Sequence, residues 1–342
     1  FHDGELRFSS PTRRARVEDS SVLVQEALVD GLLKERRTPR HTSDKAPGAL
    51  FELLYSGEMK TMVAERRDTV LVLDDGAARF PWELLIDRFR GPGQPQSVSG
   101  GLIRNLRVDV TPAMESAHND SVLIIGDPPS AWSELKGAQR EARAVARLMG
   151  DARGWKVTKQ IRHEDPDMGP GTIVKALMED RYRVVHFTAH GLYWKGDPPT
   201  AGVIIGAKKN GKKKDGSDRY DPILLTPSDV LQMPAVPDLV FINCCHLGRQ
   251  EEDGAFLDDR PQLASNMASQ FIQNGVRAVI AAGWEVMDKA ATAFAERFYE
   301  AMLDGQTFGE AVRVARQHIY DRFKGNNTWG AFQCYGDPGF RL

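Results

Sequence analysis

Two residues with the chemistry of a nucleophile and its base follow two apolar stretches of this chain. Cys245 comes after the run LVFI at residues 239–242, and His190 comes shortly after the run VVHF at residues 184–187. An imidazole can take the proton from a thiol, and the resulting thiolate attacks a carbonyl carbon. Gly191 leaves room for a substrate backbone and has an N–H that can help hold an oxyanion. We therefore interpret Cys245 as a nucleophile and His190 as its partner.

The neighbouring cysteine and histidines fit structural roles better. A free cysteine is often only a small buried residue, and this reading suits Cys244, which should face the opposite side of the strand from Cys245. His186 lies inside its apolar strand, so we interpret it as structural. His246 follows Cys245 directly, and adjacent side chains on a strand point apart, which leaves it a lining role.

A metal centre is the main chemical alternative at this position. Zinc is held by cysteine and histidine side chains, and four of these lie at the two strand ends: His190, Cys244, Cys245 and His246. The sequence has no second Cys/His cluster with zinc-ligand spacing, so we expect neither a metal nor another cofactor.

Asp127 follows a third apolar stretch, in the sequence GDPP at residues 126–129. This turn has neither the GxGxxG nor the Gly-Lys-Ser/Thr pattern of phosphate loops, so nucleotide binding has support only at the level of fold. Asp127 could line a pocket for a basic side chain, or it could cap the following turn.

The elements that position these residues alternate between apolar strands and amphipathic helices. We expect strands at residues 121–126, 155–161, 183–191, 201–205, 237–242, 276–283 and 332–335, and helices at 135–149, 171–180, 261–274, 288–303 and 308–323. This alternation predicts an α/β fold with a mostly parallel sheet and helices on both faces. In such sheets ligands gather at the carboxyl ends of the strands, where Cys245 and His190 stand.

The chain before residue 119 differs in character and is predicted to be a separate part, which divides the protein into residues 1–118 and 119–342. Residues 1–20 are expected to be irregular, followed by helices at 21–33 and 49–55, a strand at 69–73, a helix anchored by FPWELL at 80–85, a loop at 90–101 and a strand at 102–110. The lysine-rich insert at 208–220 is predicted to be a solvated hairpin loop around Asn210-Gly211.

Composition excludes several classes of protein. The 342 residues, 41% of them hydrophobic, can form real cores, and a net charge of −2 argues against a broad nucleic-acid-binding surface. Three cysteines make no disulfide framework, which favours a reduced, cytoplasmic location. There is no signal peptide and no apolar run near the roughly 20 residues that span a membrane. Because the chain starts at Phe1 rather than Met, we expect it to come from a longer protein.

In combination these motifs resemble the caspase-like (clan CD) cysteine peptidases, which include caspases, metacaspases and separase, and most closely their CHAT-domain branch. In that family one strand ends in His-Gly and a later one in Cys-x-x-Gly, as in AHG at 189–191 and CHLG at 245–248. NCCHLG at 243–248 is similar to the DxCHSG of metacaspases. Further similarity lies in LKGA at 135–138, WEVMD at 284–288, TWGAF at 328–332, YGDP at 335–338 and FPWELL at 80–85.

The resemblance implies a caspase-hemoglobinase fold, preceded by a degenerate, non-catalytic caspase-like part, and protein cleavage by a Cys245–His190 dyad. The backbone N–H groups of Gly191 and Cys245 would hold the oxyanion. Asn243 stands where metacaspases have an acidic residue that binds Arg or Lys, so the residue preference before the cleaved bond stays open. Substrate contacts are expected from Asp127, Asn243 and the segment containing Trp284, Glu285 and Asp288.

Family relatives in bacteria act in immunity and cell death, including antiviral defence. They are controlled by a sensor or partner, and some cleave gasdermin-like or other effector proteins. We therefore expect a protein substrate and a regulatory partner, with rearrangement at residues 208–220 and 249–260 on activation. The competing hypothesis is a catalytically silent caspase-like scaffold that signals by protein binding.

Overall fold

The structure is a computed structural model of the 342-residue chain. It describes residues 1–11, 17–34, 45–64, 69–89, 93–107, 119–194, 200–212, 215–230, 232–233, 235–246 and 260–342, with Cys245 and His246 described through their backbone. The predicted activation segment at 249–260 therefore lies, apart from its last residue, outside the described residues.

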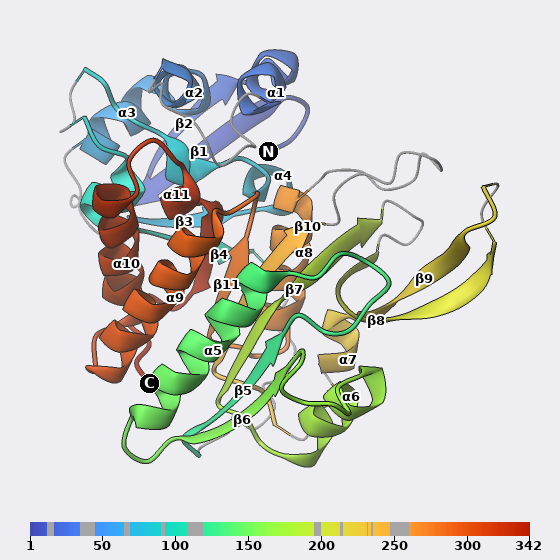
Figure 1. Ribbon diagram of the computed structural model, residues 1–342. Coiled ribbons are helices and arrows are strands. Elements are labelled where there is room, and N and C mark those ends of the chain that lie inside the picture. The colour runs from blue at the N-terminus through green and yellow to red at the C-terminus, as the bar shows by residue number, and fades with distance from the viewer. Residues whose placement is uncertain are drawn as a thin grey trace.

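The described strands, apart from an amino-terminal hairpin, form one mostly parallel sheet, as predicted, in the order β3-β4-β12-β11-β10-β7-β5-β6 (Figure 1). Its centre is a parallel block of β5 (Ser121–Gly126), β6 (Lys156–Ile161), β7 (Val184–Trp194), β10 (Leu239–His246) and β11 (Ala278–Ala282). Three strands beside β11 run the opposite way: β12 (Phe332–Gly336), β4 (Leu102–Leu106) and β3 (Thr69–Leu73). The strands of both predicted parts, 1–118 and 119–342, thus share one sheet.

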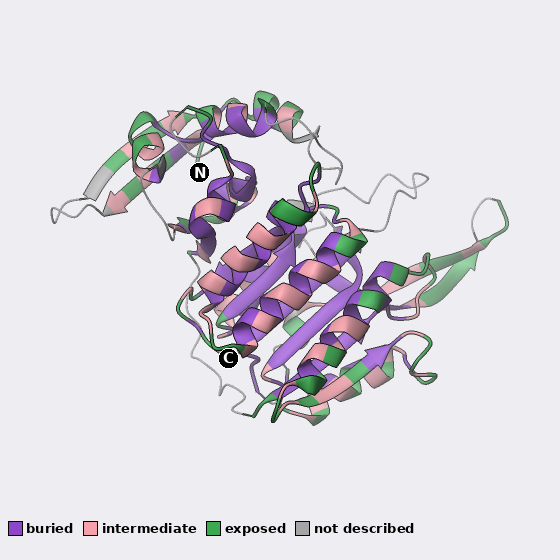
Figure 2. Cartoon of the chain, turned by 60° about the vertical axis from the view of Figure 1, so that its left-hand side comes forward, coloured by how far each residue is buried: buried purple, intermediate pink, exposed green. Residues whose placement is uncertain are grey.

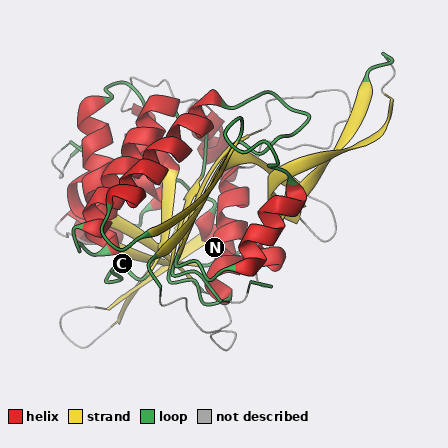
Figure 3. Cartoon of the chain, turned by 60° about the horizontal axis from the view of Figure 1, so that its bottom comes forward, coloured by secondary structure: helices red, strands yellow, loops and turns green. Residues whose placement is uncertain are grey.

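Helices cover both faces of this sheet, as Figure 3 shows from below. One face packs against α5 (Lys136–Asp151), α9 (Asp288–Leu303) and α10 (Phe308–Arg322). The other packs against α6 (Pro170–Glu179) and α8 (Arg260–Gln273), with the short α7 (Pro227–Val230) beside α8. Each central strand is therefore buried on both sides, which explains its continuous apolar sequence (Figure 2).

The amino-terminal segment is a β-hairpin, which corrects the predicted irregular lead-in. β1 (Glu5–Pro11) pairs antiparallel with β2 (Val17–Leu23), and the helix expected from residue 21 begins only at α1 (Glu26–Lys34). Leu6 is buried, and Phe8 packs against Tyr55 and Trp82, while the intervening residues are polar. This period-two alternation is too short and too diluted by charge to stand out in the sequence. Two helices follow, α2 (Lys45–Leu54) and α3 (Gly57–Ala64).

Four short elements complete the described chain: α4 (Asp75–Ala78), the 3₁₀ turn η1 (Trp82–Leu84), the π-helical turn η2 (Ser97–Gly101) and α11 (Thr328–Ala331). The helix expected from the FPWELL motif is thus a single 3₁₀ turn. Leu85 is already extended, and the Trp82 indole donates to the Ala77 carbonyl oxygen, which fixes the turn against α4.

The lysine-rich insert extends a long hairpin that projects from the body of the molecule (Figure 1). β8 (Thr200–Lys212) pairs with the end of β7 and with β9 (Asp218–Leu225). The predicted turn at Asn210-Gly211 is wrong, because Gly211 lies within β8 at φ +82°, where the register shifts. Lys209 and Lys212 both pair with Asp218, at 2.8 and 2.6 Å, so cross-strand charge pairs continue the ribbon past the glycine. No helix among the described residues has the length and apolar character needed to cross a bilayer.

Candidate active site

The two strand ends predicted to carry the reactive pair are neighbours in the sheet. β7 and β10 pair in parallel, and their register places Cys245 opposite His190 and His246 opposite Gly191. Paired strands lie about 4.8 Å apart, so the two residues start from adjacent backbone positions at the carboxyl edge of the sheet. β5 and β11 flank this pair, which brings the segments after Gly126 and Ala282 to the same edge.

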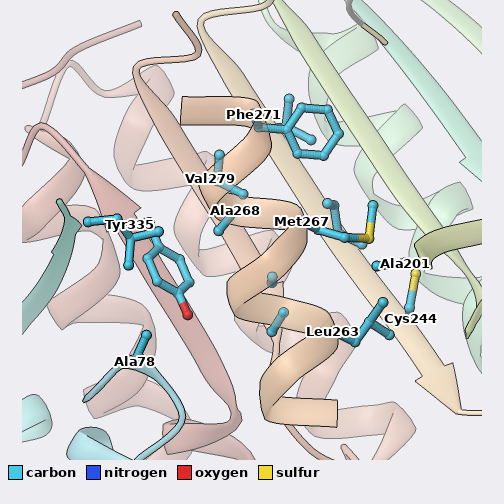
Figure 4. Packing of buried hydrophobic residues seen from close by; sticks show 14 of the residues in the cluster. Ala78, Ala201, Cys244, Leu263, Met267, Ala268, Phe271, Val279 and Tyr335 are labelled. Carbon is cyan, nitrogen blue, oxygen red and sulfur yellow. The ribbon is translucent and has the colours of Figure 1, made fainter. Parts of the chain in front are cut away.

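The alternation of side chains separates the two adjacent cysteines. Cys244 is buried on the α8 face, where Leu263 and Met267 surround it (Figure 4), so its predicted packing role is confirmed. Asn243 contacts Glu141 of α5 on the other face. Position 245 therefore belongs to the α5 face, the same face as His186 and, by the same alternation, His190.

His190 is held by a backbone carbonyl. Its Nε2 lies 2.8 Å from the carbonyl oxygen of Ser133, and only 4% of the residue is exposed. A carbonyl oxygen can only accept, so Nε2 carries the hydrogen and donates it. In the neutral ring this leaves Nδ1 as the nitrogen that can take a proton. The carbonyl thus selects the tautomer of a general base.

A buried polar network lies below the pair on the same face. The Asn243 amide donates to Glu141 Oε2 at 2.7 Å, and Glu141 Oε1 is 3.4 Å from His186 Nε2. His186 Nδ1 lies 3.1 Å from the Tyr299 hydroxyl, whose pKa is raised well above its ordinary value by burial and by the charge of Glu141. Tyr299 therefore keeps its proton and donates to His186. The structural interpretation of His186 is confirmed.

Neither Ser133 nor Glu141 was among the residues selected from the sequence. A backbone carbonyl has no sequence signature. Glu141 did have one, because it lies three residues after Ala138 and four before Val145, inside the apolar stripe of α5. A carboxylate in an apolar stripe is seldom buried without a partner, so it indicates a buried polar contact.

The predicted substrate residues all lie at the carboxyl edge, but their environments differ. Asp127 and Trp284 are buried, and Glu285 is exposed. Asp288 begins α9 and pairs with Arg140 of α5 at 3.0 Å. The amide of Asn243 is occupied by Glu141, as described above. Contact with a substrate remains a prediction for all five residues.

Gly191 has a packing role that the sequence did not indicate. A Cβ at this position would lie 2.7 Å from Cys244 Cβ and 3.0 Å from Leu263 Cδ2. We expect Gly191→Ala to lower the free energy of unfolding by about 1–3 kcal/mol, measured by urea denaturation, because overpacking forces the strand tips apart. Gly150→Ala is the control, since its Cβ would meet nothing closer than 3.9 Å and helical Ala is favoured. Equal stability of Gly191→Ala and the wild type would contradict this expectation.

Among the described residues, no group of three or more His, Cys, Asp or Glu side chains is arranged to hold a metal ion. The polar groups at the strand ends instead contact one another and the backbone. What the described part of the site offers chemically is a histidine with a fixed tautomer beside the backbone of a cysteine.

A mostly parallel sheet with helices on both faces, and with Cys and His on adjacent strand ends, defines the caspase-like class of cysteine peptidase folds. Within that class the chain belongs to the CHAT domain family, whose model matches residues 45–337. A search of curated protein sequences gives no significant match.

Solved structures share this fold at low sequence identity. The Arg-specific cysteine proteinase gingipain R is 13% identical with a TM-score of 0.50, covering 84% of this chain and 69% of its own. The complex of Porphyromonas gingivalis RgpB pro- and mature domains is 12% identical with the same TM-score, covering 94% and 70%. The Saccharomyces cerevisiae separase–securin complex is 13% identical with a TM-score of 0.41, covering 78% of this chain and 15% of its own. The caspase-like fold predicted from the sequence is thus confirmed.

Proposed function

We propose that this chain is a cysteine endopeptidase that cleaves a protein substrate through Cys245 and His190. The observation that carries the proposal is the register of β7 and β10, which pairs these two residues, together with the carbonyl that holds His190 Nε2. Membership of a caspase-like peptidase family supports the same reaction class.

The proposed reaction has two halves. His190 Nδ1 takes the proton of the Cys245 thiol, and the thiolate attacks the scissile carbonyl carbon. The backbone N–H groups of Gly191 and Cys245 hold the oxyanion, and the imidazolium gives its proton to the leaving amine. Water, deprotonated by His190, then hydrolyses the thioester and restores the free thiol.

Carboxylates at the same edge favour a basic residue before the cleaved bond. Glu285 and Asp288 are exposed and lie in the segment between β11 and α9. Arg140 already pairs with Asp288, so a substrate cation would compete with it for that carboxylate. Glu285 is therefore the carboxylate we expect to contribute most to this preference.

The cellular setting is proposed from the family resemblance. The substrate would be an effector protein, gasdermin-like or of another kind, in a bacterial immunity or cell-death pathway in the cytoplasm. A partner or sensor would activate the peptidase. The β8–β9 hairpin, which projects from the body and carries Lys208, Lys209 and Lys212, is a surface that such a partner could reach.

The test is cleavage of a fluorogenic peptide library, varied at the residue before the scissile bond, by wild type and Cys245→Ala with candidate partners added. We expect cleavage by the wild type, with preference for Lys or Arg, and none by Cys245→Ala. Equal cleavage by both would contradict the proposal.

Iodoacetamide labelling interprets a silent library. A catalytic thiolate at Cys245 should react well below about pH 8. Cys334 is an internal control, because burial raises the pKa of its thiol to about 12, so it stays protonated and unreactive there. Labelling of Cys245 without cleavage would indicate a missing activator. Absence of both would favour the scaffold hypothesis.

A further inference from the structure

Asp127 lies in a conformation that a side chain other than glycine seldom adopts. It follows β5 directly with φ at +50° and is fully buried. Its N–H donates to the Thr188 carbonyl oxygen at 2.8 Å, which ties the end of β5 to β7 two residues before His190. Such strained residues cluster at functional sites and persist only where the surroundings hold them.

The carboxylate of Asp127 closes the loop formed by residues 128–135. Its Oδ2 accepts from the Leu135 N–H at 3.1 Å and from Gln139 Nε2 at 2.9 Å. Leu135 is the N-cap of α5 and has no capping side chain of its own, so Asp127 supplies the acceptor that the first turn needs. A negative charge at this helix end is also favoured by the helix dipole.

The same loop carries the carbonyl that holds His190. Ser133 lies two residues before Leu135, and its oxygen accepts from His190 Nε2 at 2.8 Å. We infer that Asp127 is a positioning residue: by fixing the 128–135 loop it sets the place of the Ser133 carbonyl, and thereby the orientation and tautomer of His190. This inference rests on the proposed function, in which His190 is the base.

The competing role for Asp127 is the predicted one, a contact with a basic substrate side chain. Its Oδ1 is buried and has no hydrogen-bond donor within the described part of the chain, as a pocket for a cation would require. Against this, Asp127 is fully buried, and Arg162 Nη1 already lies 3.6 Å from Oδ2. The occupied oxygen faces the loop, and this is the contact that the positioning role explains.

The two roles differ in what the loss of the carboxylate changes. A positioning residue acts on the base, so its loss lowers the thiolate fraction of Cys245 with or without substrate. A pocket residue acts only on substrates with a basic side chain, and the free thiol is unaffected. The pH dependence of Cys245 alkylation in the full chain therefore separates them.

The variants are Asp127→Ala, Asp127→Gly and Asp127→Asn, with His190→Ala as the reference for a lost base. Glycine keeps the positive φ without strain and serves if Asp127→Ala does not fold. Asparagine keeps an acceptor oxygen for Leu135 and Gln139. Asp238→Ala is the matched control, because Asp238 is also buried and binds Arg183 at 3.2 Å, but at the opposite end of the sheet.

Iodoacetamide labelling of Cys245 is followed by mass spectrometry across pH. We expect Asp127→Ala and Asp127→Gly to move the labelling profile toward that of His190→Ala. A midpoint that rises by about one pH unit leaves about tenfold less thiolate at any pH below the thiol pKa. Asp127→Asn should recover most of the difference, and Asp238→Ala should match the wild type. With the peptide library, kcat should fall and the preference for the residue before the cleaved bond should stay unchanged.

Two results would overturn the inference, and they are distinguishable. A wild-type labelling profile in Asp127→Ala and Asp127→Gly, with or without a selective loss of cleavage after Lys and Arg, would leave the dyad intact and exclude the positioning role. A wild-type protein whose Cys245 profile is unchanged by His190→Ala would overturn the proposed dyad, and the role of Asp127 with it.

Discussion

His190→Ala is expected to lower kcat/KM by about 10²–10⁴-fold, the range that a positioned general acid–base contributes. Without the imidazole the Cys245 thiol returns toward its free pKa of about 8.5, so the residual activity should rise with pH through that value. The leaving amine also loses its proton donor, so the deficit should persist above it. Rates of peptide cleavage across pH for wild type and variant measure both effects.

His318→Ala is the matched control for this prediction, because it removes a half-buried histidine on α10, away from the strand ends. It should leave cleavage close to that of the wild type. Added imidazole should partly restore His190→Ala, since it can enter the space left by the ring. Turnover retained in His190→Ala without imidazole would exclude His190 as the base.

The strands that bring the site together could be predicted because their signals are local. β5, β7, β10 and β11 are continuous apolar runs ended by glycine or polar residues, as expected of strands buried on both faces. The separation of Cys244 from Cys245 followed from the period of two alone. Residues 1–20 and 208–220 were mispredicted because their alternation is interrupted by charges that pair across strands or face solvent.

The contacts that hold the site could not be predicted, because each joins distant parts of the chain. Asn243 was selected as a substrate residue from its place two before the cysteine, yet its amide binds Glu141, 102 residues earlier. Ser133 acts through a backbone carbonyl, which any residue carries. Asp127 was selected correctly as a residue at a strand end, but the choice between a pocket and a loop anchor needed the geometry of Leu135 and Gln139.

The same limit applies to Glu83 in the FPWELL motif, whose charge stabilises the junction of β4, η1 and α10. Arg104 donates to it through Nε at 2.8 Å and through Nη2 at 2.5 Å, and Arg316 Nη2 lies 3.8 Å away, with all three side chains fully buried. Burial opposes the charge of Arg104, but attraction to Glu83 outweighs it and raises the pKa of the guanidinium above its ordinary value. Both arginines also donate to backbone carbonyls, including those of Phe80 and Leu102.

Glu83→Gln is therefore expected to lower the free energy of unfolding by about 3–5 kcal/mol, because it leaves two buried guanidinium groups without a counter-charge. Urea denaturation with an unchanged m-value measures it. Glu164→Gln is the matched control, since its pair with Arg143 at 2.5 Å is partly exposed and should contribute about 1 kcal/mol or less. Equal losses in the two variants would show that burial of the pair does not set its contribution. A large loss in Glu83→Gln alone would show that this motif is kept for the charge inside the sheet rather than for the turn that the sequence suggested.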